Sequence, residues 1–148
     1  MRFASKIKRL KNDILGKEYS LSMAFVSENK SREINKKYRK VDRATNVLSF
    51  PLRKGEGELV FCKEVIKREV AEKNKSPHRR SAGEAETFEE WLLFLVIHGM
   101  LHLKGLKHSA TMEKREEYYD KKYFGRDRRG VFHHQSGSGR IRQGRKKS

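Results

Sequence analysis

The chain of 148 residues contains one cysteine, two prolines and no long hydrophobic run. A single cysteine cannot form an internal disulfide, which excludes a disulfide-stapled scaffold and favours a reducing compartment. The longest apolar stretch, Trp91 to Ile97, is much shorter than the roughly 20 residues that a membrane-spanning helix needs. The first residues also lack the apolar core of a signal peptide. We therefore expect a cytoplasmic protein with no membrane partner.

Acidic residues are scarce, with 19 Asp and Glu against 36 Lys and Arg, and the formal net charge is +17. A positive field attracts polyanions, and RNA and DNA are the first candidates. Eight of the cationic residues and one aspartate follow Gly125 and flank a Ser/Gly patch. We therefore expect a single domain over residues 1–124 and a basic tail over residues 125–148, which is disordered on its own and binds RNA by releasing counterions.

Hydrophobic periodicity predicts both helices and strands. Apolar residues recur every three or four positions in helical segments and every second position in strands. We expect helices over residues 3–15, 63–73, 88–103 and 109–123, and one that starts after Asn29 or Ser31 and runs through Ile34 to about Tyr38. Strands are expected over residues 21–27, 47–52 and 58–62. The predicted fold class is α/β of the α+β type, a small mixed sheet of three or four strands covered by helices. Because residues 88–103 are apolar nearly all round, this helix should be buried at the centre.

Capping residues and glycines predict where these elements begin and end. Thr87 and Glu90 match a capping box at the start of the central helix. Asn29 or Ser31 could cap the second helix, and the stretch Gly55 to Gly57 should form a hairpin turn. Residues 74–86 have the composition of an exposed loop, with His78 at its surface.

Three histidines at the end of the central helix predict a metal site. His98 and His102 are four residues apart, so both imidazoles lie on one helix face. Gly105 can end the helix in the left-handed conformation and turn the chain so that His108 returns towards the pair. Three imidazoles without a fourth nearby ligand fit one zinc ion with a position open for reactants, whereas a structural zinc takes four protein ligands.

Other candidate ligands are weaker. His133 and His134 are adjacent and so point to different sides on regular structure. Cys62 lies in an apolar stretch and is expected to be a buried small hydrophobe rather than a fourth ligand. Gly99 occupies the place where H-E-x-x-H metalloproteases carry the glutamate that acts as general base, which disfavours a protease.

Two separate stretches together resemble the YbeY family of endoribonucleases, also called ribosomal RNA maturation factors. One is H-G-x-L-H-L-x-G-x-x-H from His98 to His108, and the other is N-x-x-Y-R-x-x-D-x-x-T-N-V-L-S-F-P from Asn35 to Pro51. The resemblance spans roughly Phe25 to Tyr123. It departs from the family at Lys107, where an aspartate is usual, so a carboxylate partner for the metal ligands is lost from that position.

The resemblance implies that His98, His102 and His108 bind zinc and that Arg39 is a functional arginine near them. It also implies an endoribonuclease that cuts single-stranded RNA, matures the 3′ end of small-subunit rRNA and takes part in ribosome quality control, with ribosomal proteins or assembly factors as possible partners. In this reading Arg39 neutralises charge on the phosphate while Lys104 and Lys107 guide the strand. For Arg39 the alternative is a surface arginine that pairs with Asp42.

Two other functions fit the residues. One is an RNA-binding ribosome assembly factor without catalysis, in which zinc only fastens His108 to the helix. The other is a small zinc hydrolase of peptides or amides. Replacing His98 by alanine would distinguish the binding module from an enzyme. An enzyme would lose cleavage and keep its fold and RNA affinity, whereas a module held together by its metal would first lose stability.

Overall fold

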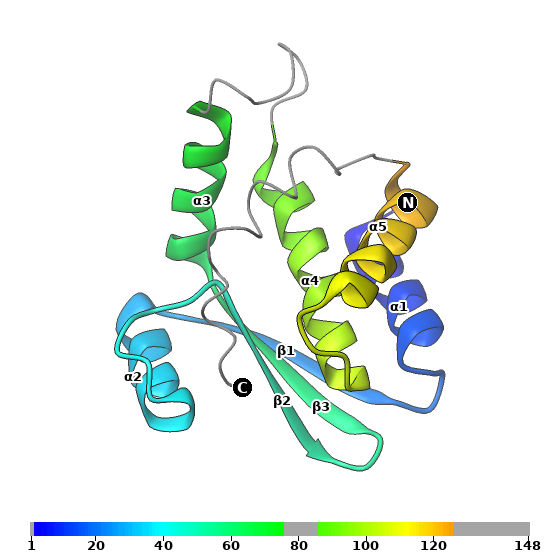
Figure 1. Cartoon of the computed structure of the whole chain (residues 1–148), viewed down its shortest axis with the longest axis horizontal. Helices are drawn as coiled ribbons and strands as arrows, with labels where there is room; N and C mark the ends of the chain where they lie inside the picture. The colour runs from blue at the N-terminus through cyan, green and yellow to red at the C-terminus, as the bar shows by residue number, and fades with distance from the viewer. Residues whose placement is uncertain (1, 76–85, 126–148) are drawn as a thin grey trace.

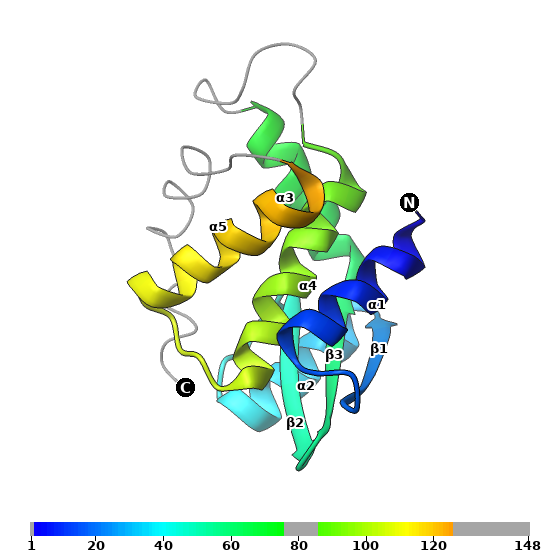
Figure 2. The same cartoon turned by 90° about the vertical axis from the view of Figure 1, so that its right-hand side faces the viewer.

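The computed structural model describes residues 2–75 and 86–125, and in this part of the chain five helices surround a three-stranded sheet (Figures 1 and 2). This confirms the predicted α+β class. The elements in chain order are α1 (Phe3–Ile14), β1 (Ser20–Val26), α2 (Glu28–Arg39), β2 (Val47–Arg53), β3 (Glu56–Cys62), α3 (Lys63–Lys75), α4 (Phe88–Lys104) and α5 (Ala110–Phe124). The predicted tail after Gly125, with His133 and His134, lies outside the described residues, as does His78.

The sheet is mixed, as predicted, and its strands are ordered β1-β3-β2. β1 runs parallel to β3, and β2 pairs antiparallel with β3 through a tight hairpin. The turn is shorter than the predicted stretch, because β3 already begins at Glu56 and only Lys54 and Gly55 form the turn. Gly57 lies inside the strand, where a side chain would collide with Tyr19 and Leu103. Its role is close packing rather than turning.

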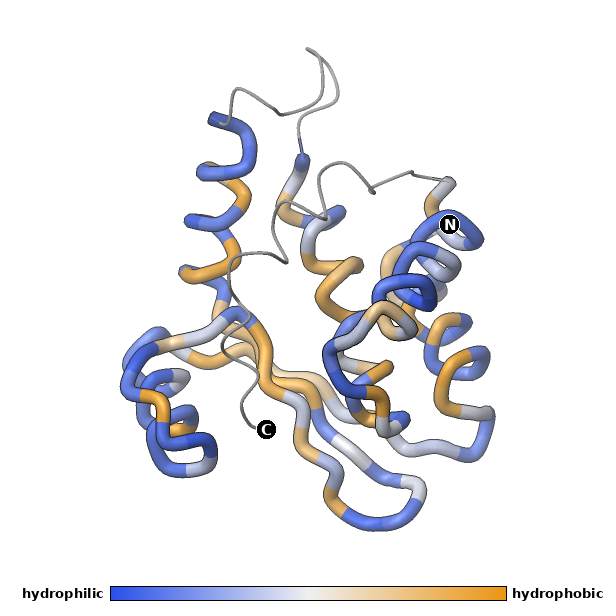
Figure 3. The backbone as a smooth tube through the Cα atoms, viewed as in Figure 1, coloured by the Kyte–Doolittle hydropathy of each residue, from blue (hydrophilic) through white to orange (hydrophobic). Residues whose placement is uncertain are grey.

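Helix α4 is the centre of the hydrophobic core. All residues from Trp91 to Ile97 are buried, and the apolar colouring of Figure 3 is concentrated along α4 and the strands while α2 is mostly hydrophilic. The predicted capping box is present, since the Glu90 amide donates to the Thr87 hydroxyl at 3.0 Å and the Thr87 amide donates to the Glu90 carboxylate at 3.1 Å. Gly105 ends the helix with φ +112°, the left-handed conformation predicted for it.

Helices lie on both faces of the sheet (Figure 1). Side chains alternate along a strand, so Ser49 and Leu59 face α4, whereas Phe50 faces the opposite side, where α2 packs. Helix α2 is longer than predicted and begins at Glu28, because Ser27 rather than Asn29 or Ser31 is its cap. The Ser31 hydroxyl instead bonds the amide and carbonyl of Thr45, at 3.0 and 3.2 Å.

Two further contacts close the fold. The Asp13 carboxylate accepts from Lys122 at 2.8 Å and from the Tyr123 hydroxyl at 2.6 Å, which ties α1 to α5. The Asn74 side chain bonds the backbone amide and carbonyl of Glu86 at 2.8 and 3.0 Å, so the two described ends of the predicted loop lie together. Among the helices of the described residues, none has the length and apolar content that crossing a membrane requires.

The packing of Gly99 generates a prediction about stability. A Cβ at this position would lie 2.7 Å from a methyl of buried Leu59, so Gly99→Ala must displace a side chain that is fully packed. Overpacking of this kind costs about 1–3 kcal/mol and exceeds the ~1 kcal/mol that alanine gains over glycine in a helix. We expect Gly99→Ala to lower the free energy of unfolding, measured by urea denaturation.

Leu59→Val supplies the control, because a shorter side chain opens the space that the new methyl needs. The two substitutions together should be less destabilising than the sum of each alone. Strict additivity, or a more stable Gly99→Ala protein, would show that the contact between α4 and β3 is loose.

Candidate metal centre

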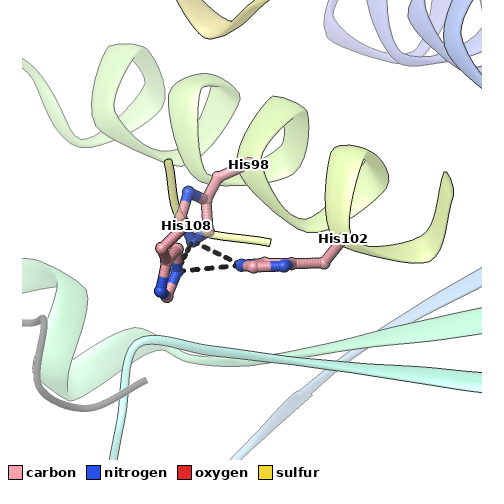
Figure 4. Close-up of side chains that lie close together, drawn as sticks. All are labelled: His98, His102 and His108. Carbon is pink, nitrogen blue, oxygen red and sulfur yellow. Dashed lines mark hydrogen bonds between the residues drawn. The ribbon is translucent and has the colours of Figure 1, made fainter. Parts of the chain in front are cut away.

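The three predicted histidines converge at one point between α4 and the segment that follows it (Figure 4). His98 and His102 project from the last two turns of α4, and His108 returns to them after the turn at Gly105. Their Nε2 atoms are 3.2 Å apart for His98 and His102, 3.0 Å for His102 and His108, and 3.4 Å for His98 and His108. The predicted convergence is therefore confirmed.

Hydrogen bonds on the far side of two rings determine where their protons lie. The Nδ1 atom of His98 is 2.5 Å from the Glu116 carboxylate, and that of His102 is 2.9 Å from the carbonyl oxygen of Leu106. Carboxylate and carbonyl oxygens only accept, so each Nδ1 carries a proton and donates it. In the neutral ring this leaves both Nε2 atoms as bare lone pairs.

The histidines could hold a metal ion because these lone pairs face one another. Burial, and after it the charge of His98, lowers the pKa of His102 to about 4, so this ring is neutral at pH 7. When His98 is neutral as well, there is no proton to share between the two Nε2 atoms, which lie 3.2 Å apart, and their lone pairs repel. A cation at the point of convergence turns this repulsion into attraction, and neutral imidazole nitrogen is a common metal donor.

The cluster has one side open. His98 and His102 are partly buried, whereas His108 is exposed. Within residues 2–75 and 86–125, the group of possible ligands consists of the three histidines alone, with no carboxylate or thiol among them. Cys62 is fully buried in β3, as predicted, and is not part of the group. An ion held here would keep room for a further ligand.

Gly99 faces the sheet, which explains why no base stands at this position. Its backbone carbonyl accepts a hydrogen bond from the Ser49 hydroxyl at 3.2 Å, and Leu59 packs against its Cα. A glutamate side chain would have to enter this closed contact instead of reaching the metal centre. The departure from the metalloprotease pattern is thus a requirement of packing between α4 and the hairpin.

Glu116 supplies the carboxylate that was missing from the sequence analysis. Lys107 is exposed, and the acidic partner of His98 comes from α5, where Glu116 is only 4% exposed. Met112, Glu116 and Tyr119 share the buried face of this helix at helical spacing. Asp120 is buried on the same helix, so the signal available in the sequence was two acidic residues at positions of the buried face, and it did not identify His98 as the partner of Glu116.

Arg39 lies near the histidines at the end of α2. Its positive charge contributes to the lowered pKa of His102, which places the guanidinium within electrostatic range of that ring. Burial, and then the neighbouring charge of Arg43, lowers the pKa of Arg39 itself, yet a guanidinium stays charged at pH 7. Asp42, the partner considered in the alternative reading of Arg39, pairs with Arg32 at 2.7 Å.

Hydrogen bonds hold both ends of the loop that follows Arg39. Lys40 ends α2 with φ +62°, and the Asn35 side chain donates to the Arg43 carbonyl at 2.8 Å. At the other end the Asn46 amide donates to Glu69 of α3 at 3.0 Å, and Glu69 also accepts from the Trp91 indole at 2.9 Å. This network connects α2, α3 and α4 around the loop and fixes the approach of Arg39 to the histidines.

Lys104 has a structural contact that the sequence analysis did not anticipate. Its ammonium donates to the Ile14 carbonyl at 3.0 Å, at the end of α1, where the last carbonyls of the helix lack intrahelical partners. This contact attaches α1 to α4 and weighs against the predicted role in guiding RNA. Lys107 is exposed and remains available for such a role.

Comparisons with known proteins agree on one family. A family model described as "Endoribonuclease YbeY" matches residues 2–123. The Endoribonuclease YbeY of Colwellia psychrerythraea is 38% identical over 106 residues, which are 67% of this chain and 61% of the relative. That of Chromobacterium violaceum is 37% identical over 112 residues, 70% of this chain and 59% of the relative. The chain thus spans about six tenths of the length of these curated relatives.

A solved structure shares the fold. The solution structure of TM1509 from Thermotoga maritima matches with a TM-score of 0.56 and 27% sequence identity, and the match covers 92% of this chain and 85% of that one.

Glu116 should control metal affinity through His98. Glu116→Gln keeps an oxygen that can accept from Nδ1 but removes the negative charge that makes the imidazole a stronger donor. We expect metal affinity to fall about 10- to 100-fold, the usual effect of losing a partner behind a ligand. Competition with a chromophoric chelator measures this. The neighbouring Glu117→Gln makes the same charge change without the contact and should bind metal as the original chain does; equal affinities in both variants would contradict this role.

Proposed function

Because the chain belongs to the YbeY family, we propose that it is a metal-dependent endoribonuclease that cuts single-stranded RNA. The observation that carries this proposal is the arrangement of three imidazole nitrogens around one point with an open side. The relatives are named endoribonucleases, and the chain carries both sequence stretches that mark the family.

Zinc is the metal that we propose. Ligand nitrogens at about 2.0–2.1 Å from a tetrahedral zinc lie about 3.3 Å from one another. The three Nε2 pairs here are separated by 3.0–3.4 Å. His98, His102 and His108 would hold the ion, and all three are borderline donors of the kind that zinc accepts. The spacing and the donor set support zinc over hard cations such as magnesium, which prefer oxygen.

The chain's own residues prepare the site for phosphodiester cleavage. A bound zinc would supply Lewis acidity towards a phosphoryl oxygen or a water molecule. Glu116 and the Leu106 carbonyl hold two rings in the orientation and tautomer that binding requires. Arg39 would stabilise negative charge on the phosphate with a planar, permanently charged guanidinium. The partly buried setting strengthens this interaction relative to bulk water.

The substrate class follows from the charge and the family. A net charge of +17 favours a polyanion, and the basic residues after Gly125 would add phosphate contacts. We extend the proposal to the 3′ end of small-subunit rRNA and to ribosome quality control in the cytoplasm, on the strength of the family resemblance. The peptidase alternative loses ground, because Gly99 is enclosed and cannot be replaced by a general base.

Removing a ligand should abolish cleavage while RNA binding survives. His102→Ala takes away one of three metal donors, so we expect loss of bound zinc and of RNA cleavage, with RNA affinity and the unfolding transition little changed. Metal analysis, a cleavage assay and denaturation of the same preparation test this. Chelation of the original chain should have the same effect, and zinc should restore it. The contrary result is an original chain that does not cleave RNA and a His102→Ala variant that loses both stability and RNA affinity. The chain would then be a binding module with a structural metal.

Arg39 should act on the rate of cleavage. Arg39→Ala removes a charge that stabilises the transition state, which typically costs about 10²- to 10³-fold in rate. We expect kcat to fall by that order with a small change in RNA affinity, and Arg39→Lys to recover part of it. Arg43→Ala is the matched control, because it removes the same charge from the adjoining loop. A similar fall in kcat in both variants would mean that Arg39 contributes only to the overall positive field of the chain.

A further inference from the structure

An exposed aromatic pair lies where the end of α2 meets the edge strand β2. The Tyr38 and Phe50 rings are 5.6 Å apart at an interplanar angle of 72°, an edge-to-face contact. Tyr38 is 61% exposed, the largest value among the exposed large hydrophobic residues of the described chain, and Leu52, further along β2, is 54% exposed. Burial therefore does not explain why these side chains are apolar.

The surroundings of the pair are positively charged. Residues 28–43 contain seven Lys and Arg against three Asp and Glu. All three acids already have cationic partners: Glu28 with Arg68, Glu33 with Lys30 and Asp42 with Arg32. Lys36 interacts electrostatically with Asp42, whereas Lys37 and Lys40 form no ion pair within the described residues. The Lys37 ammonium lies 5.3 Å from the centre of the Tyr38 ring. This surface therefore offers uncompensated positive charge to an anion.

The aromatic pair adjoins the metal centre along two separate chain segments. Tyr38 precedes Arg39, the arginine at the end of α2 that we propose acts at the metal centre. Phe50 follows Ser49, whose hydroxyl bonds the carbonyl of Gly99, the residue after His98. Ser49 and Phe50 point to opposite faces of β2, which is an edge strand of the sheet in the described residues, so Gly99 and the aromatic pair lie on opposite sides of this edge. A chain that crosses this edge would extend from the side of α4 to the aromatic pair.

We propose that the Tyr38–Phe50 pair is a stacking surface for a base of single-stranded RNA, placed beside the nucleotide that occupies the metal centre. The inference rests on the proposed function and adds how the substrate is held. An exposed ring beside uncompensated lysines fits an unpaired base with its phosphate, because every base has a face that stacks and every phosphate is anionic. The bases of a duplex are already stacked on their neighbours, which accounts for a preference for single strands.

The test uses the zinc-loaded full chain and two labelled pentanucleotides with 2′-O-methyl riboses, one with bases and one abasic. Tyr38→Leu keeps an apolar contact for Phe50 but removes the flat ring, and it should weaken binding of the base-bearing oligomer about fivefold to hundredfold. Affinity for the abasic oligomer should not change. Fluorescence anisotropy measures both, and a gel run after each titration checks that the oligomer is intact.

Tyr118→Leu is a matched control. Tyr118 is 55% exposed, makes an edge-to-face contact with Tyr119, and has the Lys122 ammonium 5.7 Å from its ring centre, so its environment copies that of Tyr38. It lies on α5, two residues from Glu116 and hence on another side of that helix. This variant should bind both oligomers as the original chain does.

Tyr38→Trp gives a direct readout that does not depend on loss of binding. A base stacked on the indole quenches its fluorescence, so the base-bearing oligomer should quench Tyr38→Trp and the abasic oligomer should not. Four results would each overturn the inference. Tyr38→Leu could bind the base-bearing oligomer as tightly as the original chain, or bind both oligomers equally more weakly. The abasic oligomer could quench Tyr38→Trp, or the original chain could bind neither oligomer.

Cleavage is measured separately on an unmodified RNA, so the two proposals can fail independently. Stacking without cleavage would leave the inference standing and refute the endoribonuclease. Cleavage by a chain in which Tyr38→Leu does not affect RNA binding would support the endoribonuclease and refute the stacking surface. The aromatic pair would then be a contact surface for a protein partner.

Discussion

Two hydrogen bonds to the Nδ1 atoms of His98 and His102 determine what the histidine cluster can do. They direct the Nδ1 protons to Glu116 and to the Leu106 carbonyl, so in the neutral rings the opposite Nε2 atoms meet as lone pairs. The first bond joins α4 to α5, and the second depends on the turn at Gly105 that also returns His108. The site that could hold a cation is thereby built from contacts that also hold the fold together.

The central helix makes these contacts rigid. Helix α4 is buried along most of its length, and close packing of Gly99 on Leu59 fixes its distance from the hairpin. The bond from Ser49 to Gly99 then sets the edge of β2 beside His98, and the fastened loop between Arg39 and Asn46 carries α2 to the same edge. The residues that we propose for catalysis and for RNA binding therefore lie beside structural contacts at a single strand edge.

Local rules predicted much of this arrangement from the sequence. The capping box at Thr87, the left-handed Gly105 and the four-residue spacing of His98 and His102 depend on neighbours in the chain, and the structure has all of them. What local patterns could not specify were contacts between distant elements. Glu116 reaches His98 across 18 positions, and Lys104 reaches Ile14 across 90. Ser27 displaced the expected cap of α2 for a similar reason, because Ser31 is engaged by Thr45.

X-ray absorption spectroscopy of the zinc-loaded chain tests the shared metal centre most directly. We predict three imidazole nitrogens at about 2.0 Å from the zinc and one exchangeable oxygen ligand, with one zinc bound per chain. A sulfur ligand from Cys62, a fourth imidazole that closes the site, or zinc bound by fewer than the three histidines would contradict it.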